Sequence, residues 1–483
     1  MSEAREPMRR VVVAGDGPLG ALAALALKRA LPGAQVLVIG TPPDPAAFGE
    51  RSPTALPFSL RLLARLGVNE EELVLKCGGS HRLAIRYLHG EEQGVAAYGE
   101  EVDPRKHTGF AKNWGGGPRN ASQLAPPGSL SEILAANGRF SPPAPGAQSP
   151  LAGIEYALRW HAGALRALLA DKAREAGVQR MAGAISAVRP DGRGGTAAVS
   201  VEGTGEIEAD LFVDCSGPAA AILSHLPEAK RLEWSRELPL RAVMFGQPGQ
   251  PIAALEDRVT ATDCGWRWEV AGRDGLAAIL GVAAGADEVS AARALGGEAT
   301  PVPLSLGRAE SPWIGNVVAL GDAATQVDPL CGFAADLAHR QLDLLLELLP
   351  GREVHPLERD EFNRRAGLMA DRTRDVLTAH LHAPAMRGAF PEIELSDELQ
   401  LALDQFTRRA RVPFFEESPL LTQEWASLLA ALGYEAGEGA MALAADMRVM
   451  ESEARAFAAR ADAALRTAPP YREWLGKVLS APT

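Results

Sequence analysis

The chain has 483 residues, of which 47% are hydrophobic and 23% charged, a composition typical of a soluble globular protein. Its 49 basic and 61 acidic residues give a net charge of −12, which argues against nucleic acid or an anionic membrane as a partner, since neither attracts an acidic surface. The length exceeds one comfortable hydrophobic core, so we expect two domains.

Targeting and metal signals are missing from the sequence. No apolar run approaches the roughly 18 residues of a membrane-spanning helix, and residues 1–10 lack the apolar core of a signal peptide. The four cysteines are dispersed without a C-x-x-C pair, so we expect neither a metal site nor a disulfide. We therefore expect a cytoplasmic protein.

The N-terminal residues predict a β-α-β unit that binds a dinucleotide. A buried strand is expected over Arg10–Ala14, an Ala/Leu-rich helix over Ala21–Leu31, and a second strand over Ala34–Ile39. The turn between the first strand and the helix reads G-x-G-x-x-G. Its glycines let backbone amides approach a pyrophosphate at the helix N-terminus. The expected cofactor-binding residues of this turn are Gly15, Gly17 and Gly20.

The second strand lacks the acidic residue that usually binds the ribose hydroxyls in such units. Gly40 and Thr41 stand at that place. Asp44 is near but lies in a Pro-rich turn, where aspartate commonly shapes the turn itself. The ribose contact is therefore lost, moved, or made by the backbone.

The middle of the chain alternates between an irregular segment and short strands. Residues 99–150 are rich in Pro, Gly, Ser and Asn and predict a lid, a binding loop or disorder. An amphipathic helix is expected over Tyr156–Ala176. Strands are then expected at 184–188, 197–201, 209–213, 241–245, 265–270, 277–282 and 315–320, before a helix at 334–349 and a mainly helical region from 358 onward.

Several segments in chain order resemble the FAD-dependent tryptophan halogenases, within the wider group of aromatic flavin monooxygenases. Besides the glycine turn, Gly49-Glu50-Arg51-Ser52 is similar to the family's Gly-Glu-Ala/Ser-Thr, and 209–217 (ADLFVDCSG) is close to the family's wording. Residues 265–270 (GWRWEV) resemble the W-x-W-x-I-P signature, and 313–324 (WIGNVVALGDAA) leads to Asp328-Pro329-Leu330.

The resemblance implies how FAD is held. Asp322 would reach the ribityl or pyrophosphate region, and the Asp328-Pro329-Leu330 turn would present amides to the isoalloxazine. Asp322 has an alternative role as a helix N-cap, and Asp214 has one in bridging backbone amides. The FAD-binding residues implied beyond the glycine turn are Gly49, Ser52, Asp214, Gly217, Asp322, Pro329 and Leu330.

Trp266 and Trp268 alternate along a predicted strand and so face the same side. The resemblance implies an indole wall between flavin and substrate chambers. Packing of a core face is the alternative interpretation. Val270 and Ala271 replace the family's isoleucine and proline, so the signature is incomplete.

Two positions depart from the family's catalytic pattern. Arg82 stands where the family has a lysine that presents hypochlorous acid to the arene; arginine keeps the charge but cannot form a haloamine. A solvated or ion-paired side chain is the alternative for Arg82. Cys331-Gly332-Phe333-Ala334 replaces the family's Glu-Ser-Thr-Gly, so the assisting glutamate is missing. Cys331 is either a flavin contact or a small buried residue. The candidate catalytic residues are Arg82, Trp266, Trp268 and Cys331.

The resemblance implies an α/β fold of the FAD-binding Rossmann type, with an inserted antiparallel sheet and a C-terminal helical region. We expect an FAD-binding domain over 8–350, interwoven with a substrate sheet at about 80–110 and 220–310, and a helical substrate or cap region over 351–483. Phe414, Phe415, Trp425, Tyr434 and Trp474 in this region are candidate substrate contacts, with amphipathic packing as their alternative.

The predicted activity is halogenation or hydroxylation of an indole-like aromatic with reduced FAD and O2. No second nucleotide-binding loop follows the first, so a separate flavin reductase is expected to supply reduced FAD. A homodimer is among the arrangements that the resemblance allows. A catalytically degenerate flavin- or ligand-binding protein is the alternative, and a nicotinamide dehydrogenase would rest on the first glycine turn alone.

Overall fold

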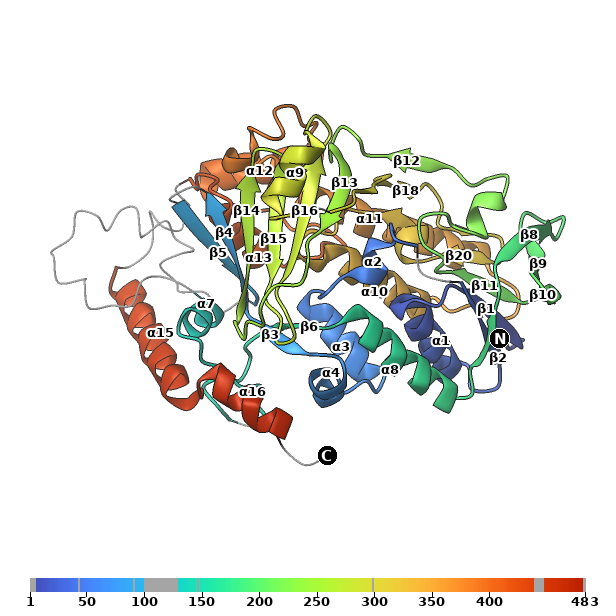
Figure 1. Ribbon diagram of the computed structural model, residues 1–483, viewed down its shortest axis with the longest axis horizontal. Helices are drawn as coiled ribbons and strands as arrows, with labels where there is room; N and C mark the ends of the chain where they lie inside the picture. The colour runs from blue at the N-terminus through green and yellow to red at the C-terminus, as the bar shows by residue number, and fades with distance from the viewer. Residues whose placement is uncertain are drawn as a thin grey trace.

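A computed structural model describes residues 6–41, 44–89, 92–99, 129–144, 146, 148–297, 299–437 and 447–480. Most of the irregular segment for which a lid is predicted, and residues 438–446 before the last long helix, lie outside these ranges. Figure 1 shows the first sheet with its helices at one side and a second, larger sheet beside it.

The predicted β-α-β unit is present as β1 (Arg10–Ala14), α1 (Pro18–Ala30) and β2 (Gln35–Gly40). Helix α1 begins three residues earlier than predicted because proline suits the first helical turn, where its missing N–H would have no partner anyway. The sheet has the order β19-β20-β11-β1-β2-β7 and is parallel except for its β19–β20 edge. Its other strands are β7 (Gln179–Ala182), β11 (Leu211–Asp214), β19 (Trp313–Ile314) and β20 (Val317–Ala319).

The helix predicted over Tyr156–Ala176 is wrong in its first third. Ala157–Arg159 form strand β6, which pairs with β3 (Ser80–Arg82), and helix α8 starts only at Ala162 and ends at Glu175. All three residues of β6 are buried, which a helix end with an amphipathic pattern would not allow. His161 caps α8 by accepting from the Ala164 amide at 3.4 Å.

The larger sheet interleaves two distant parts of the chain, residues 84–97 and 240–303. Its order is β17-β13-β16-β15-β14-β4-β5. The pairing is mixed, because β14 runs parallel to β4 while the other neighbours are antiparallel. The strands are β4 (Ala84–His89), β5 (Glu92–Ala97), β13 (Leu240–Phe245), β14 (Glu256–Thr262), β15 (Gly265–Val270), β16 (Ala277–Ala283) and β17 (Val302–Pro303).

Two small sheets complete the strands. The strands predicted at 184–188 and 197–201 are present in an antiparallel sheet of β8 (Ile185–Pro190), β9 (Thr196–Val201) and β10 (Gly205–Glu208). The second is β12 (Arg231–Glu233), β18 (Gly307–Ala309) and β21 (Thr325–Gln326).

Helices cover the sheets and make up most of the C-terminal region (Figure 1). Helices α1 and α8 pack together. Helix α10 (Phe333–Glu347) packs against α1, α3 (Pro57–Arg65) and α11 (Pro356–Leu381). None of the helices in the described ranges is long and apolar enough to cross a membrane. The remaining α-helices of the described chain are α2 (Phe48–Arg51), α4 (Glu70–Lys76), α7 (Leu130–Ala136), α9 (Glu288–Ala294), α12 (Asp397–Arg409), α13 (Thr422–Ala431), α15 (Met447–Thr467) and α16 (Tyr471–Ser480).

Candidate functional site

The glycine turn between β1 and α1 has no room for side chains. Gly15 has a φ of +112°, and a Cβ there would lie 2.2 Å from the Cys215 carbonyl oxygen. A Cβ at Gly20 would lie 2.3 Å from the Gly15 carbonyl oxygen, so this glycine lets α1 pack against the turn. A Cβ at Gly17 would lie 2.2 Å from Glu50 Oε2. The three glycines therefore form the close backbone turn that the motif predicts.

The slot beside this turn is closed by the ends of β1, β2 and β11 and by α2. Gly217, which has a φ of +87°, also lines this slot. Asp214 keeps its carboxylate within its own segment: it accepts from the Ile222 and Leu223 amides at 2.8 and 2.9 Å. The backbone-bridging alternative for Asp214 is therefore present. The slot is lined by Gly15, Asp16, Gly17, Thr41, Asp44, Ala47, Glu50, Cys215, Ser216 and Gly217.

Asp322 caps a helix, although a different one from the helix that follows it in sequence. Its Oδ2 accepts from the Gly49 amide at 2.9 Å, in the first turn of α2. Gly49 must be a glycine here, because a Cβ would lie 2.9 Å from the same oxygen. Asp322 Oδ1 is buried and has no partner in the described chain. Burial raises the pKa of Asp322 to about 7.

Glu50, quoted in the motif but not singled out, is the second buried carboxyl of this region. Its Oε2 accepts from the Leu19 amide at 2.9 Å, in the first turn of α1, while Oε1 is buried and unpartnered among the residues described. Burial raises the pKa of Glu50 to about 8, and the nearby Asp322 adds to this rise. Ser52, two residues on, is buried; its hydroxyl donates to Thr54 O, and its carbonyl accepts from Trp160 Nε1.

At Gly40, where an acidic residue was expected, an arginine takes the space. A Cβ on Gly40 would lie 2.8 Å from Arg180 Nη2. Arg180 and Arg166 both form ion pairs with the buried Asp16 of the glycine turn. Although burial raises the pKa of Asp16, the hydrogen bonds from Arg180 and Arg166 lower it overall, so the carboxylate stays charged. Asp44 accepts from the Ala46 amide at 2.7 Å, which is the turn-forming role.

These residues fit FAD on the protein's own geometry. The glycine turn admits close approach of a ligand to its backbone, and two buried carboxyl oxygens, Glu50 Oε1 and Asp322 Oδ1, lack partners in the described chain. Unpaired buried polar atoms are rare in folded proteins and indicate a missing hydrogen-bonding group. The slot would hold the cofactor's dinucleotide part, and the flavin would supply oxygen activation when bound.

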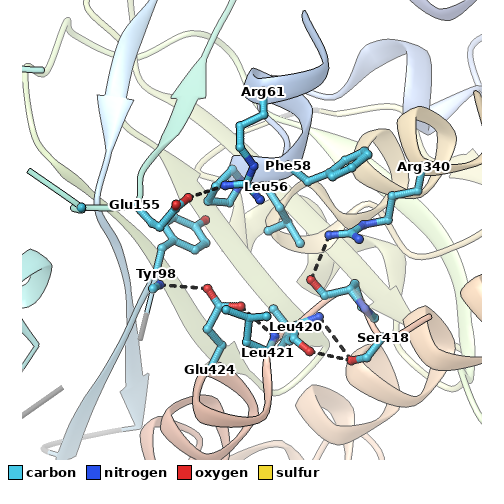
Figure 2. Close-up of a pocket in the computed structure, with 14 residues that line it drawn as sticks. Leu56, Phe58, Arg61, Tyr98, Glu155, Arg340, Ser418, Leu420, Leu421 and Glu424 are labelled. Atoms are coloured by element: carbon cyan, nitrogen blue, oxygen red, sulfur yellow. Dashed lines mark hydrogen bonds and ion pairs between the residues drawn. The ribbon is translucent and has the colours of Figure 1, made fainter. Parts of the chain in front are cut away.

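A cavity of about 480 Å³ lies between α3, the end of β5 and the segment before α13 (Figure 2). We call it the Tyr98 cavity. Arg340 lies over the Phe58 ring at 4.5 Å and donates to Pro419 O, and Arg61 pairs with Glu155 at 2.5 Å. It is lined by Leu56, Pro57, Phe58, Arg61, Tyr98, Gly99, Gly153, Glu155, Arg340, Ser418, Pro419, Leu420, Leu421 and Glu424.

Two of the polar side chains that line this cavity are the buried Tyr98 and the half-buried Glu424. Tyr98 Oη is buried with no partner among the residues that the structure describes. Glu424 accepts from the Gly99 and Leu421 amides at 2.9 Å each. Burial raises the pKa of Glu424 above its ordinary value. Aromatic surface beside a few polar groups is the usual makeup of a small-molecule site.

Arg82 lies fully buried behind this cavity and is tied to three segments. Nη1 donates to Asp257 Oδ2 at 3.0 Å, and Nη2 donates to Ala55 O at 3.1 Å and Cys331 O at 3.0 Å. The guanidinium carbon lies 5.6 Å from the centre of the Tyr98 ring. The ion-paired alternative is therefore present. Nε alone has no partner within the described ranges.

Asp257 was not singled out from the sequence, yet it holds two buried arginines. Its Oδ1 accepts from Arg159 Nε at 2.8 Å and from the Ala271 amide at 3.1 Å. With Arg82 on Oδ2, one carboxylate serves two guanidinium groups, and all three side chains are almost completely buried. Arg159 was hidden in the mispredicted helix, and nothing in the β14 sequence marks Asp257 as buried.

Cys331 forms the turn that reaches Arg82. Its φ of 59° is left-handed, which costs a non-glycine residue about 1 kcal/mol, and this conformation accompanies the hydrogen bond that its carbonyl accepts from Arg82. Gly332 must lack a side chain because a Cβ would lie 2.7 Å from Thr54 O. Burial raises the pKa of the Cys331 thiol to about 12, so it is a neutral group. Among its neighbours in the loop, Leu330 donates its amide to Asp328 Oδ1 at 3.0 Å, and Pro329 has no amide hydrogen to offer.

A hydrogen-bonded pair continues from Cys331. The thiol lies 3.9 Å from Tyr87 Oη, which lies 2.9 Å from His380 Nε2. His380 Nδ1 donates to Val376 O at 2.8 Å, so Nε2 accepts from the tyrosine. Burial lowers the pKa of His380 to about 4, which keeps the imidazole neutral. Phe333 packs edge-on against this histidine.

Trp266 and Trp268 are both fully buried on β15. Trp266 Nε1 donates to Asp328 Oδ2 at 2.9 Å and so ties the strand to the loop that carries Cys331. Its indole fits because the paired residue is Gly281, where a Cβ would lie 2.2 Å from the ring. Trp268 Nε1 is buried without a partner in the described chain. Core packing is therefore present at this strand, and the indole wall between flavin and substrate chambers stays a prediction.

Most other candidates lie away from the Tyr98 cavity. Phe414 is 84% exposed. Trp425 is buried and donates to Ser418 Oγ at the cavity edge, whereas Tyr434 binds Ala379 O. Trp474 packs on the His81 ring, which also contacts Glu70 and Tyr471.

Residues 10–447 match the tryptophan halogenase family. Tryptophan 7-halogenase RebH from Lentzea aerocolonigenes is 25% identical over 444 residues, covering 82% of this chain and 81% of RebH. Tryptophan 6-halogenase SttH from Streptomyces toxytricini is 25% identical over 410 residues, covering 77% of each chain.

Solved structures show the same fold. Xcc4156, a flavin-dependent halogenase from Xanthomonas campestris, superposes with a TM-score of 0.86 at 24% identity, covering 99% of this chain and 100% of Xcc4156. BrvH, a flavin-dependent halogenase from Brevundimonas sp. BAL3, gives a TM-score of 0.84 at 24% identity, covering 98% and 99%. Because the family match spans nearly the whole described sheet and helix framework, the chain belongs to the tryptophan halogenase family.

Proposed function

We propose that this protein is an FAD-dependent oxidoreductase that uses reduced flavin and O2 to halogenate or hydroxylate an electron-rich, indole-like aromatic. One observation carries the proposal. The buried Arg82 connects the loop of Cys331, which the family resemblance implies would lie near the flavin, with the Ala55 carbonyl and also with the Tyr98 ring, which lines the cavity. A reagent formed at the flavin would thus meet the aromatic substrate beside a fixed positive charge.

The residues that would bind the cofactor in this proposal are Gly15, Gly17, Gly20, Gly49, Ser52, Gly217 and Asp322. Pro329 and Leu330 belong to the loop that would contact the flavin ring. FAD supplies the activated oxygen. Trp266 and Trp268, both buried, exclude water from this side, which matters because water destroys reactive oxygen species formed at a flavin. A separate reductase would supply the reduced cofactor.

The Tyr98 cavity would hold the substrate. Its volume of about 480 Å³ lies within the range of small-molecule sites, and Phe58 and Tyr98 offer faces for stacking a planar ring. Tyr98 Oη, which lacks a partner in the described chain, would hydrogen-bond a ring nitrogen or hydroxyl. Arg340 and Glu424 would fix charged or polar substituents of the substrate.

Hydroxylation is the second candidate reaction, and Cys331 favours it. Hypohalous acid oxidises cysteine as well as halogenating arenes, so Cys331 beside its path would compete with the aromatic substrate. Arg82 also cannot form the haloamine that a lysine can, and both of its terminal nitrogens are already engaged. Direct attack of activated oxygen on the ring needs neither a lysine nor a glutamate.

The test is a product assay with purified protein, FAD, a flavin-reducing system and a panel of indoles and phenols, with and without bromide. We expect a halide-dependent brominated product or a product that is one oxygen heavier. If FAD binds but every reducing equivalent is released as hydrogen peroxide across the panel, the protein is instead the degenerate flavin-binding alternative. A matched Tyr98→Phe variant should weaken substrate binding without changing FAD binding.

A further inference from the structure

Of two neighbouring buried carboxyl groups, Glu50 and Asp322, the first lines the slot proposed for FAD. Glu50 lines the slot and occupies the Leu19 amide of α1, and Asp322 occupies the Gly49 amide of α2. Each has a second oxygen that is buried and unpartnered in the described chain. Helix N-termini are the usual place for the phosphates of a dinucleotide, so here carboxyl groups already take the position of an anion.

The charged surroundings do not neutralise this pair. Within the described ranges, neither Glu50 nor Asp322 forms an ion pair. Arg166, on α8, faces Glu50, but Asp16 of the glycine turn already binds this arginine and Arg180.

The other groups around the pair add little positive charge. Arg231, on β12, faces Asp322 from a distance. The Cys215 thiol, after β11, faces Glu50 and is neutral because burial raises its pKa. Asp44 adds a further carboxylate to the slot. A pyrophosphate would therefore enter a region that holds more acidic than free basic groups.

We propose that Glu50 is a cofactor-binding residue that holds FAD as a neutral carboxylic acid, so that FAD binding takes up a proton. This inference rests on the proposed FAD-dependent function. A protonated carboxyl can donate a hydrogen bond to a phosphate or ribityl oxygen, whereas a carboxylate at the same place would repel it.

The sign of the pH dependence follows from linkage. Because burial already raises the pKa of Glu50 to about 8 and that of Asp322 to about 7, the free protein loses these protons near neutral pH. Bound FAD raises the pKa of Glu50 further, because a carboxylate there would repel the phosphates. Affinity is then nearly constant below about pH 6 and falls above neutrality, by up to about tenfold per pH unit for each linked proton.

The experiment is a titration of the full-length apoprotein with FAD at several pH values between about 6 and 9, by flavin fluorescence and by calorimetry. Calorimetry in two buffers of different ionisation enthalpy counts the protons taken up. Glu50→Gln keeps an acceptor for the Leu19 amide but cannot ionise. Glu175→Gln, at an exposed site on α8, removes the same charge away from the slot. Asp322→Asn tests the second carboxyl.

The wild type and Glu175→Gln should take up a proton above neutral pH and lose affinity in parallel. Glu50→Gln should show little proton uptake and a flatter pH profile, and so should bind FAD more tightly than the wild type near pH 9. FAD binding to the wild type without proton uptake would overturn the inference while leaving the proposed function intact. Unchanged proton uptake in Glu50→Gln, with loss of uptake in Asp322→Asn, would overturn the assignment to Glu50. Absence of FAD binding at every pH would overturn the proposed function itself.

Discussion

Replacing Asp257 by asparagine should be among the most destabilising single changes at this site. The asparagine keeps the size but removes the charge, and its NH2 group replaces one of the two oxygens that accept from Arg82, Arg159 and the Ala271 amide. It leaves two buried guanidinium groups without a counter-ion. Removing one member of a buried ion pair typically costs about 3–5 kcal/mol, and here the lost carboxylate serves two partners.

The assay is the free energy of unfolding from urea denaturation, compared with Glu256→Gln. Glu256 is the neighbouring residue on β14 and pairs at 2.8 Å with Arg86, but this pair is partly exposed. The control should lose about 1 kcal/mol or less, as pairs near the surface do. An equal, small loss in both variants would refute the reasoning, because the backbone carbonyls alone would then hold Arg82 and Arg159.

Three further changes test other parts of the site. Gly281→Ala should lose about 1–3 kcal/mol of unfolding free energy by overpacking against the Trp266 indole, whereas Gly285→Ala, where a Cβ meets nothing within 4 Å, should change it little; equal losses by urea denaturation would contradict this. Arg82→Lys should cost about 1–3 kcal/mol through lost charged hydrogen bonds and should raise halide-dependent product measured by mass spectrometry; unchanged product would mean that the Cys331 loop blocks halogen transfer. Burial raises the pKa of Asp328 to about 7, so between about pH 4 and 7 the folded protein binds a proton that the unfolded chain lacks, and the free energy of unfolding falls as pH rises through this range. Asp328→Asn should reduce the slope of unfolding free energy against pH by up to about 1.4 kcal/mol per pH unit, measured by denaturation at a series of pH values. An unchanged slope would contradict the assignment.

The nucleotide-binding unit was predictable because its signals are local. The strand β1, the glycine turn and the helix α1 follow one another within the 21 residues from Arg10 to Ala30, and each has its own residue pattern. The pairing of β6 with β3 was not predictable, since it joins segments about 77 residues apart and the short ALR sequence fits a helix equally well. The parallel contact of β14 with β4 is missed for the same reason.

The chemistry of the site was only partly predictable. Position in the motifs places Arg82 and Cys331, but their environment depends on Asp257, which the fold brings from a distant strand. Glu50 lies in a quoted motif, yet its burial beside Asp322 is a property of the folded chain. The FAD contacts of the individual residues, the domain boundary at 350 and 351, and the homodimer stay predictions.

The most direct test of the account is a single turnover of the FAD-loaded, pre-reduced protein with isotopically heavy O2, bromide and an indole. We predict an indole that carries either bromine or one heavy oxygen atom. Complete recovery of the heavy oxygen in hydrogen peroxide, with the indole unchanged while FAD is bound, would contradict the claim that this site modifies an aromatic substrate.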